Sequence, residues 1–105
     1  MKGKKTSKDE STLIQQAKEG DRTAFAEIYD RHQPAIYRYI FYRVGDAAAE
    51  DLTSEVFVRL VDSIEHFTYQ GRPLLAWLYT IAHNLVTDHH RSTGRATMVP
   101  LDERL

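Results

Sequence analysis

The sequence predicts an all-α protein, a compact bundle of three long helices preceded by a short one. Apolar residues recur at three- and four-residue steps through long segments, which is the period of an amphipathic helix. Glycine and proline fall between these segments, where they end or begin helices. At 105 residues, with 42% apolar and 28% charged residues, the chain has the size and composition of one globular domain.

Composition excludes several classes of protein. No apolar run approaches the roughly 20 residues that cross a bilayer, so we expect no membrane insertion. The chain has no cysteine, and its basic N-terminus lacks the apolar segment of a signal peptide. We therefore expect a cytoplasmic protein. Residues 1–10 are expected to be a disordered basic tail, with Lys2, Lys4, Lys5 and Lys8.

The first two helices are marked by glycine and aspartate. We expect a short helix from Ser11 to Glu19, ended by Gly20, and then Asp21 as the N-cap of a second helix that runs to about residue 44. Pro34 should bend this helix without breaking it, because the apolar period continues on both sides. The expected buried stripe is Phe25, Ile28, Tyr29, His32, Ala35, Ile36, Tyr39 and Ile40. Within it, we expect His32 to be a hydrogen-bonded core histidine and not a metal ligand.

A third helix is expected from Asp46, as its N-cap, to about residue 66. At 100° per residue its two halves differ. The apolar half contains Leu52, Val56, Phe57, Leu60, Val61, Ile64 and Phe67, and the charged half contains Asp51, Glu55, Arg59, Asp62 and Glu65. Val58 lies within the charged half. A solvated surface with one stray valine is the simpler explanation, but an apolar residue among acids is also typical of a docking face for a basic helix.

A turn over residues 70–73 precedes the fourth helix, with Pro73 at its first position and its end near Ser92. Its buried stripe is predicted to be Leu74, Leu78, Ile81, Ala82 and Leu85, with Trp77 and Leu75 on the two edges. The opposite face is rich in uncharged hydrogen-bonding groups: Tyr79, Thr80, His83, Asn84, Thr87, His90 and Arg91. Such groups suit contacts with base edges. In the preceding loop, we favour the core for Phe67 and leave open whether Tyr69 stacks on a base.

Two stretches of the chain resemble a known family. AEDLTSEVFVRLVDSI and AWLYTIAHNLVTDHHR are similar to conserved region 2 of bacterial RNA polymerase sigma factors, specifically the extracytoplasmic-function (ECF) group. The resemblance covers roughly residues 21–91 and implies a sigma factor region 2 helical domain over residues 11–93. Residues 94–105 include VPLDE, which resembles the linker to a second DNA-binding domain, region 4. The chain therefore looks like part of a longer one.

This resemblance implies roles for two surfaces. The acidic helix would dock on a coiled coil of the core RNA polymerase clamp, through Asp51, Glu55, Val58, Arg59 and Asp62. The loop and fourth helix would bind the non-template strand of the minus-ten promoter element as it opens, with one base flipped into a pocket. The implied DNA-facing residues are Tyr69, Arg72, Tyr79, Thr80, His83, Asn84, Thr87 and Arg91. Whether an anti-sigma factor also binds is left open.

The chain departs from the family pattern in its charge. Leu74 and Leu75 stand where many members have Phe-Arg, and Thr80 and His83 stand where arginines are common. Thr80 and Ile81 also replace the tryptophan pair of housekeeping sigma factors, which argues against strong intrinsic melting of duplex DNA. We therefore expect the isolated domain to bind DNA weakly.

Two other classes of function fit part of the sequence. A helical protein-interaction module unrelated to transcription would show the same amphipathic patterning. A metal-dependent enzyme would use His83, His89 and His90 with Asp88. At 100° per residue, however, His89 points towards the core edge and His90 towards the outer face, so they do not converge easily on one ion. No catalytic or phosphate-binding motif occurs, and we expect no enzyme activity, cofactor or metal.

Overall fold

The structure is a computed structural model that describes residues 9–68 and 71–93. Within these ranges the chain forms only helices, and the all-α prediction is confirmed. The elements are α1 (Glu10–Lys18), α2 (Arg22–Val44), α3 (Asp46–Ser63), the 3-10 helix η1 (Ile64–His66) and α4 (Leu74–Ser92). The expected N-terminal tail, apart from residues 9 and 10, and the expected linker lie outside the described residues. No helix in the described part of the chain has the length and apolar character that crossing a membrane requires.

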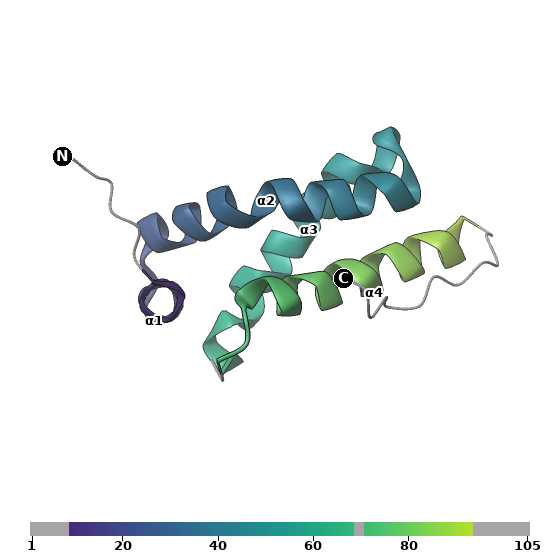
Figure 1. Cartoon of the computed structure of the whole chain (residues 1–105). Helices are drawn as coiled ribbons and strands as arrows, with labels where there is room; N and C mark the ends of the chain where they lie inside the picture. Colours follow the sequence, from purple (N-terminus) through teal and green to yellow (C-terminus); the bar gives the residue numbers. More distant parts are fainter. Residues whose placement is uncertain (1–8, 69–70, 94–105) are drawn as a thin grey trace.

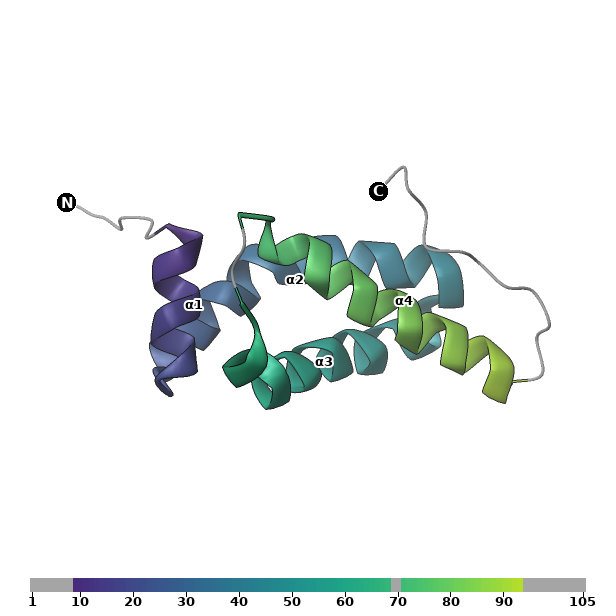
Figure 2. The same ribbon diagram turned by 90° about the horizontal axis from the view of Figure 1, so that it is seen from below.

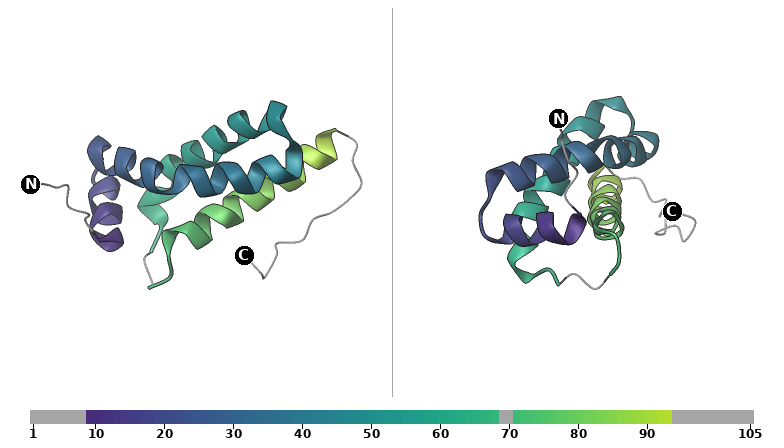
Figure 3. Two further views of the ribbon diagram at one scale, coloured as in Figure 1. Left: turned by 45° about the horizontal axis from the view of Figure 1, so that its top comes forward. Right: turned by 60° about the vertical axis from the view of Figure 1, so that its left-hand side comes forward.

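The three long helices form the bundle and the short α1 crosses one end of it. α4 runs alongside α2 in the same direction (Figure 1). α3 and α4 run in opposite directions on either side of the loop that joins them (Figure 2), as predicted. α1 lies at the same end of the bundle as this loop (Figure 3) and packs against α2 and η1. α1 and the start of α4 therefore meet at the same end of the bundle.

The core is aliphatic and draws on every long helix. Ile36 and Ile40 of α2, Val56 and Leu60 of α3, and Leu78 of α4 are at most 1% exposed. Burying each such side chain contributes roughly 1.5–3 kcal/mol. The apolar stripes predicted from the sequence therefore supply most of the interior, and they fix how α3 and α4 sit on α2.

The helix ends follow the predicted signals with small shifts. Asp21 caps α2 by accepting hydrogen bonds from the Thr23 and Ala24 amides, at 2.8 and 3.3 Å. Gly45 ends α2 with a φ of 87°, a conformation that glycine adopts without strain. The prediction of Asp46 as an N-cap was wrong, because Gly45 holds that position and Asp46 is the first helical residue. Likewise Pro73 is the N-cap of α4 and not its first residue.

Four stripe residues of α2 are less buried than expected: Phe25, Tyr29, His32 and Ala35. Tyr29 is 41% exposed, although its ring contacts Phe57 edge to face with centroids 4.9 Å apart. His32 is half-buried, and its Nε2 lies 3.4 Å from Glu10 Oε1. The helix continues through Pro34 without a break, as predicted. His32 is therefore a polar-paired histidine at the edge of the core.

Burial lowers the pKa of His32 below its usual 6.5, and Arg31 adds to this effect while Glu10 opposes it. The folded protein therefore takes up a proton at His32 less readily than the unfolded chain does. The free energy of unfolding should be highest above pH 6.5 and should fall as the pH drops through the lowered pKa of His32. Urea denaturation at about pH 7.5 and 5.5 should show a smaller fall for His32→Gln than for the wild type. An identical fall in both proteins would contradict this assignment.

Candidate functional site

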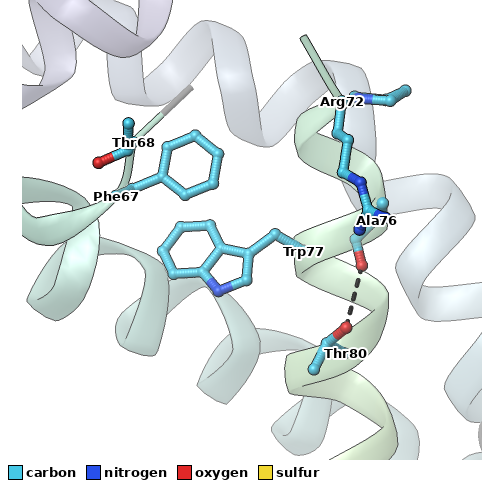
Figure 4. A pocket seen from close by; sticks show the side chains of 7 residues that line it. Phe67, Thr68, Arg72, Ala76, Trp77 and Thr80 are labelled. Carbon is cyan, nitrogen blue, oxygen red and sulfur yellow. Dashed lines mark hydrogen bonds between the residues drawn. The ribbon is translucent and has the colours of Figure 1, made fainter. Parts of the chain in front are cut away.

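A pocket of about 190 Å³ opens where the chain after η1 meets the start of α4. Figure 4 shows Phe67 and Thr68 on one side and, on the other, Arg72 just before α4 and Ala76 and Thr80 on α4, with the Trp77 indole between them. The Phe67 and Trp77 rings stack with centroids 4.5 Å apart and an interplanar angle of 20°. An aromatic wall with polar groups beside it suits a planar ligand with hydrogen-bonding edges.

Helical spacing explains how α4 builds its side of the pocket. Pro73, Ala76, Trp77 and Thr80 line it, and steps of three and four residues place them on one face of the helix. Trp77 was predicted only as the edge of the buried stripe, and it is indeed half-buried. Its part in the pocket was missed, although the same spacing applied to Thr80 would have found it. Phe67 packs against the core, as predicted, and also lines the pocket.

The predicted DNA-facing residues divide into two groups. Arg72, Thr80, Asn84 and Arg91 are exposed, and the last three form a line along α4 that leads away from the pocket. Tyr79, His83 and Thr87 are only half-buried. Tyr69 lies outside the described residues. The structure therefore brings together four of the predicted residues as one surface, which we call the α4 polar surface.

The second group borders the seam between α4 and α2. The Tyr79 ring lies 5.2 Å from the Tyr39 ring, measured between centroids. His83 Nδ1 and Thr87 Oγ1 are shielded from solvent and have no hydrogen-bond partner in the described structure. The predicted outward orientation of these side chains was thus only partly right, because α2 covers more of α4 than the apolar stripe alone indicates.

The predicted orientation of His90 was wrong. Its side chain is buried, with Nε2 3.0 Å from the Arg43 carbonyl oxygen at the end of α2. His89 is the half-buried one of the two. The reason is that α2 packs beside the C-terminal turn of α4 and closes over position 90. Within residues 9–68 and 71–93, no three His, Cys, Asp or Glu side chains gather in a way that could hold a metal ion.

The predicted polymerase-facing residues of α3 lie on its outer surface. Asp51, Val58, Arg59 and Asp62 are exposed, and Glu55 is half-buried. Arg59 Nε lies 3.2 Å from Glu55 Oε2, with side chains that are 48% and 45% exposed. Such an exposed pair contributes little to stability, about 0.5 kcal/mol. It does neutralise the one basic residue of this surface, so the surface remains acidic through Asp51 and Asp62.

Val61 was predicted in the buried half of α3, but it is 50% exposed, about as much as Val58 at 51%. The two valines are one turn apart, and Val61 borders a groove of about 250 Å³ between α2 and α3. Its lining is mainly apolar and consists of Phe25, Ala26, Tyr29, Phe57, Leu60 and Val61. Val58 is therefore one helical turn from this groove and outside its lining. We call Val58, Val61, this groove and the acids beside it the α3 surface.

Comparison with known proteins decides the family. The sequence profile of the Sigma-70 region 2 family matches residues 28–96, more than half of the chain. The chain belongs to this family.

Relatives of this sigma-70 region 2 chain are ECF sigma factors. It is 54% identical over 94 residues to the ECF RNA polymerase sigma factor BldN of Streptomyces coelicolor, covering 89% of this chain and 36% of BldN. It is 34% identical over 95 residues to SigD of Mycobacterium tuberculosis (86% and 45% covered) and 39% identical over 79 residues to SigW of Bacillus subtilis (74% and 42% covered). The chain thus spans less than half the length of these relatives.

A solved structure agrees with the sequence comparison. The structure of an RsbN–BldN complex matches with a TM-score of 0.68 and 51% identity, over 75% of this chain and 58% of that chain. The predicted recognition as an ECF sigma factor region 2, and the predicted fold of that type, are both confirmed.

Tyr79 and Thr80 adjoin in sequence but should differ in their contribution to stability. Tyr79→Ala removes the ring contact with Tyr39 and should lower the free energy of unfolding by about 1–3 kcal/mol. Thr80→Ala changes an exposed side chain and should stay within about 0.5 kcal/mol of the wild type. Urea denaturation measures both values. Equal losses for the two variants would show that Tyr79 is not a packing residue.

Proposed function

We propose that this region 2 domain links core RNA polymerase to promoter DNA in transcription initiation. The α3 surface docks on the coiled coil of the polymerase clamp, and the pocket with the α4 polar surface recognises the minus-ten element and helps to open it. The observation that carries the proposal is the stacked Phe67–Trp77 pocket at one end of an exposed, nearly uncharged polar helix face. Such a role places the protein in the cytoplasm with the polymerase.

The pocket favours an unpaired base over duplex DNA. A base that leaves the stack exposes a flat face for Trp77 and Phe67 and a hydrogen-bonding edge for Thr68, Arg72 and Thr80. Unstacking costs a few kcal/mol, and stacking on an aromatic side chain recovers about 1–3 kcal/mol per base. The balance is close, so further contacts must contribute. Asn84 and Arg91 continue the surface along α4 for the adjoining nucleotides.

Charge limits what this surface does alone. Arg72 and Arg91 supply its positive charge, and the exposed Asp88 lies between them in sequence. DNA affinity grows with the number of phosphates that a protein neutralises, so two arginines give weak binding at physiological salt. We therefore infer that the polymerase, held at the α3 surface, supplies the affinity that the α4 polar surface lacks.

The α3 surface has the layout of a docking site for a basic amphipathic helix. Val58 and Val61 form its apolar centre, and Val61 also lines the groove against α2. Asp51 and Asp62 flank this centre and would steer a basic partner towards it. Apolar contacts at the centre of an interface usually carry most of the binding energy. This layout fits one face of a coiled coil of basic character.

A further protein partner is also proposed. BldN, which is 51% identical to this chain over the matched region, has been solved in a complex with RsbN. We propose that an anti-sigma factor binds this protein as well. A helical interaction module without a role in transcription is the alternative function, and it predicts no binding to core polymerase.

Core polymerase binding should depend on the two exposed valines. Val58→Ser and Val61→Ser should each lower the affinity for core polymerase about tenfold, since each removes an apolar contact. Tyr42→Ser is the matched control, because Tyr42 is 74% exposed at the other end of α2, and it should stay within about twofold. Titration of fluorescently labelled protein with core enzyme measures the affinities. Wild-type affinity in both valine variants would favour the alternative module.

Single-stranded promoter DNA should be bound only with the polymerase present. In complex with core enzyme, Thr80→Ala and Asn84→Ala should each weaken binding of a non-template minus-ten oligonucleotide about threefold to tenfold. Thr23→Ala, exposed on α2, is the matched control and should have no effect. Fluorescence anisotropy measures the affinities. Tight, duplex-selective binding by the isolated chain would contradict the proposed dependence on polymerase.

A further inference from the structure

The short helix α1 holds the chain on both sides of the pocket. Lys18 Nζ donates a hydrogen bond to the Phe67 carbonyl oxygen at 2.8 Å. The Leu74 backbone N–H donates one to Glu10 Oε2 at 2.6 Å. These bonds join residues that are 49 and 64 positions apart in the sequence. α1 is therefore hydrogen-bonded to the chain just after η1 and again at the first residue of α4.

Glu10 takes over the capping of α4. The N-cap position of α4 is Pro73, and no side chain there accepts a hydrogen bond from the helix. The first N–H groups of a helix have no partner within it, and the helix dipole favours negative charge at this end. The Glu10 carboxylate meets both needs through a charge-assisted hydrogen bond. Its other oxygen faces His32 Nε2 at 3.4 Å, so the carboxylate is held between α2 and α4.

Each backbone group that α1 holds is next to a pocket side chain. Phe67, whose carbonyl accepts from Lys18, is the residue that stacks on Trp77. Leu74 follows directly after Arg72 and Pro73, which line the opposite side of the pocket. A shift at either held group would change the distance between the two walls of the pocket.

We propose that α1 positions both walls of the pocket through Glu10 and Lys18, and thereby tunes which base the pocket accepts. The second half of this proposal rests on the proposed function, in which the pocket receives a base. Glu10 and Lys18 are positioning residues, since neither lines the pocket. α1 is then part of the recognition apparatus and more than a stabilising extension of the bundle.

Trp77 offers a direct readout of the pocket walls. It is the only tryptophan of the chain, so intrinsic fluorescence reports its stacking on Phe67. Glu10→Ala and Lys18→Met should change its accessibility to acrylamide about twofold, and Glu10→Ala should speed hydrogen exchange of the Leu74 amide about tenfold. Glu19→Ala and Arg22→Met are matched controls at exposed positions near the C-terminal end of α1 and should change neither. Glu10→Gln retains an acceptor oxygen and should give an intermediate effect.

Base preference separates positioning from stability. The affinity of each variant, in complex with core polymerase, is measured for a panel of minus-ten oligonucleotides that carry each base at each position. Glu10→Ala and Lys18→Met should change the relative affinity for the four bases about fivefold at one position. Affinity for core polymerase should not change. A loss of stability alone would weaken binding of every oligonucleotide by the same factor.

Two different results would contradict this role of α1. Unchanged Trp77 quenching and Leu74 exchange would show that α1 does not position the walls. Changed Trp77 quenching or Leu74 exchange with unchanged relative affinities for the oligonucleotides would show that α1 positions the walls but does not affect base preference. Failure of the wild type to bind polymerase or DNA would instead overturn the proposed function, and with it the proposed effect of α1 on base preference. The quenching and exchange results would still decide whether α1 positions the pocket walls.

Discussion

The packing of every other α-helix against α2 is the constraint on which the structure depends. α1, α3 and α4 all contact it, and Ile36 and Ile40 at its centre are fully buried. Each of the three neighbouring helices turns its apolar face towards α2. The opposite face of each neighbour therefore points outward. Those outward faces of α3 and α4 are the ones that carry the candidate sites. The packing of the apolar core thus determines which helix faces are available for binding.

The two outward faces differ in physical character, and the difference suits their proposed partners. The α3 surface combines apolar area with acidic charge, which favours a folded protein partner of opposite charge. The α4 polar surface has little net charge and a small aromatic pocket, which favours a single unstacked base over the continuous phosphate backbone of a duplex. A domain built this way binds DNA well only when another protein holds it in place.

Sequence reasoning succeeded where the signal was local. The periods of the long helices, the Asp21 cap and the Gly45 terminus all depend on residues within a few positions of one another or on a repeating pattern. The partner of His32 is Glu10, on a different helix, and no local pattern identified it. Sequence reasoning failed for Val61 and His90, because a helical wheel shows which arc is apolar but not where a neighbouring helix stops. Val61 faces an open groove beside α2 and stays 50% exposed, whereas His90 is covered by the end of α2. The Glu10–Leu74 bond was equally invisible, since no spacing rule joins residues 64 positions apart.

The sequence by itself determined the class of fold, the approximate bounds of each helix and the family, because periodicity, capping and motif spacing are properties of the chain. Only the tertiary structure decided that Phe67, Trp77 and Thr80 share a pocket, that the exposed Val61 borders a groove, and that α1 forms hydrogen bonds on both sides of the pocket. Each of these depends on the angle and depth at which helices pack. Those quantities arise from the fit of whole faces, which no short stretch of sequence contains.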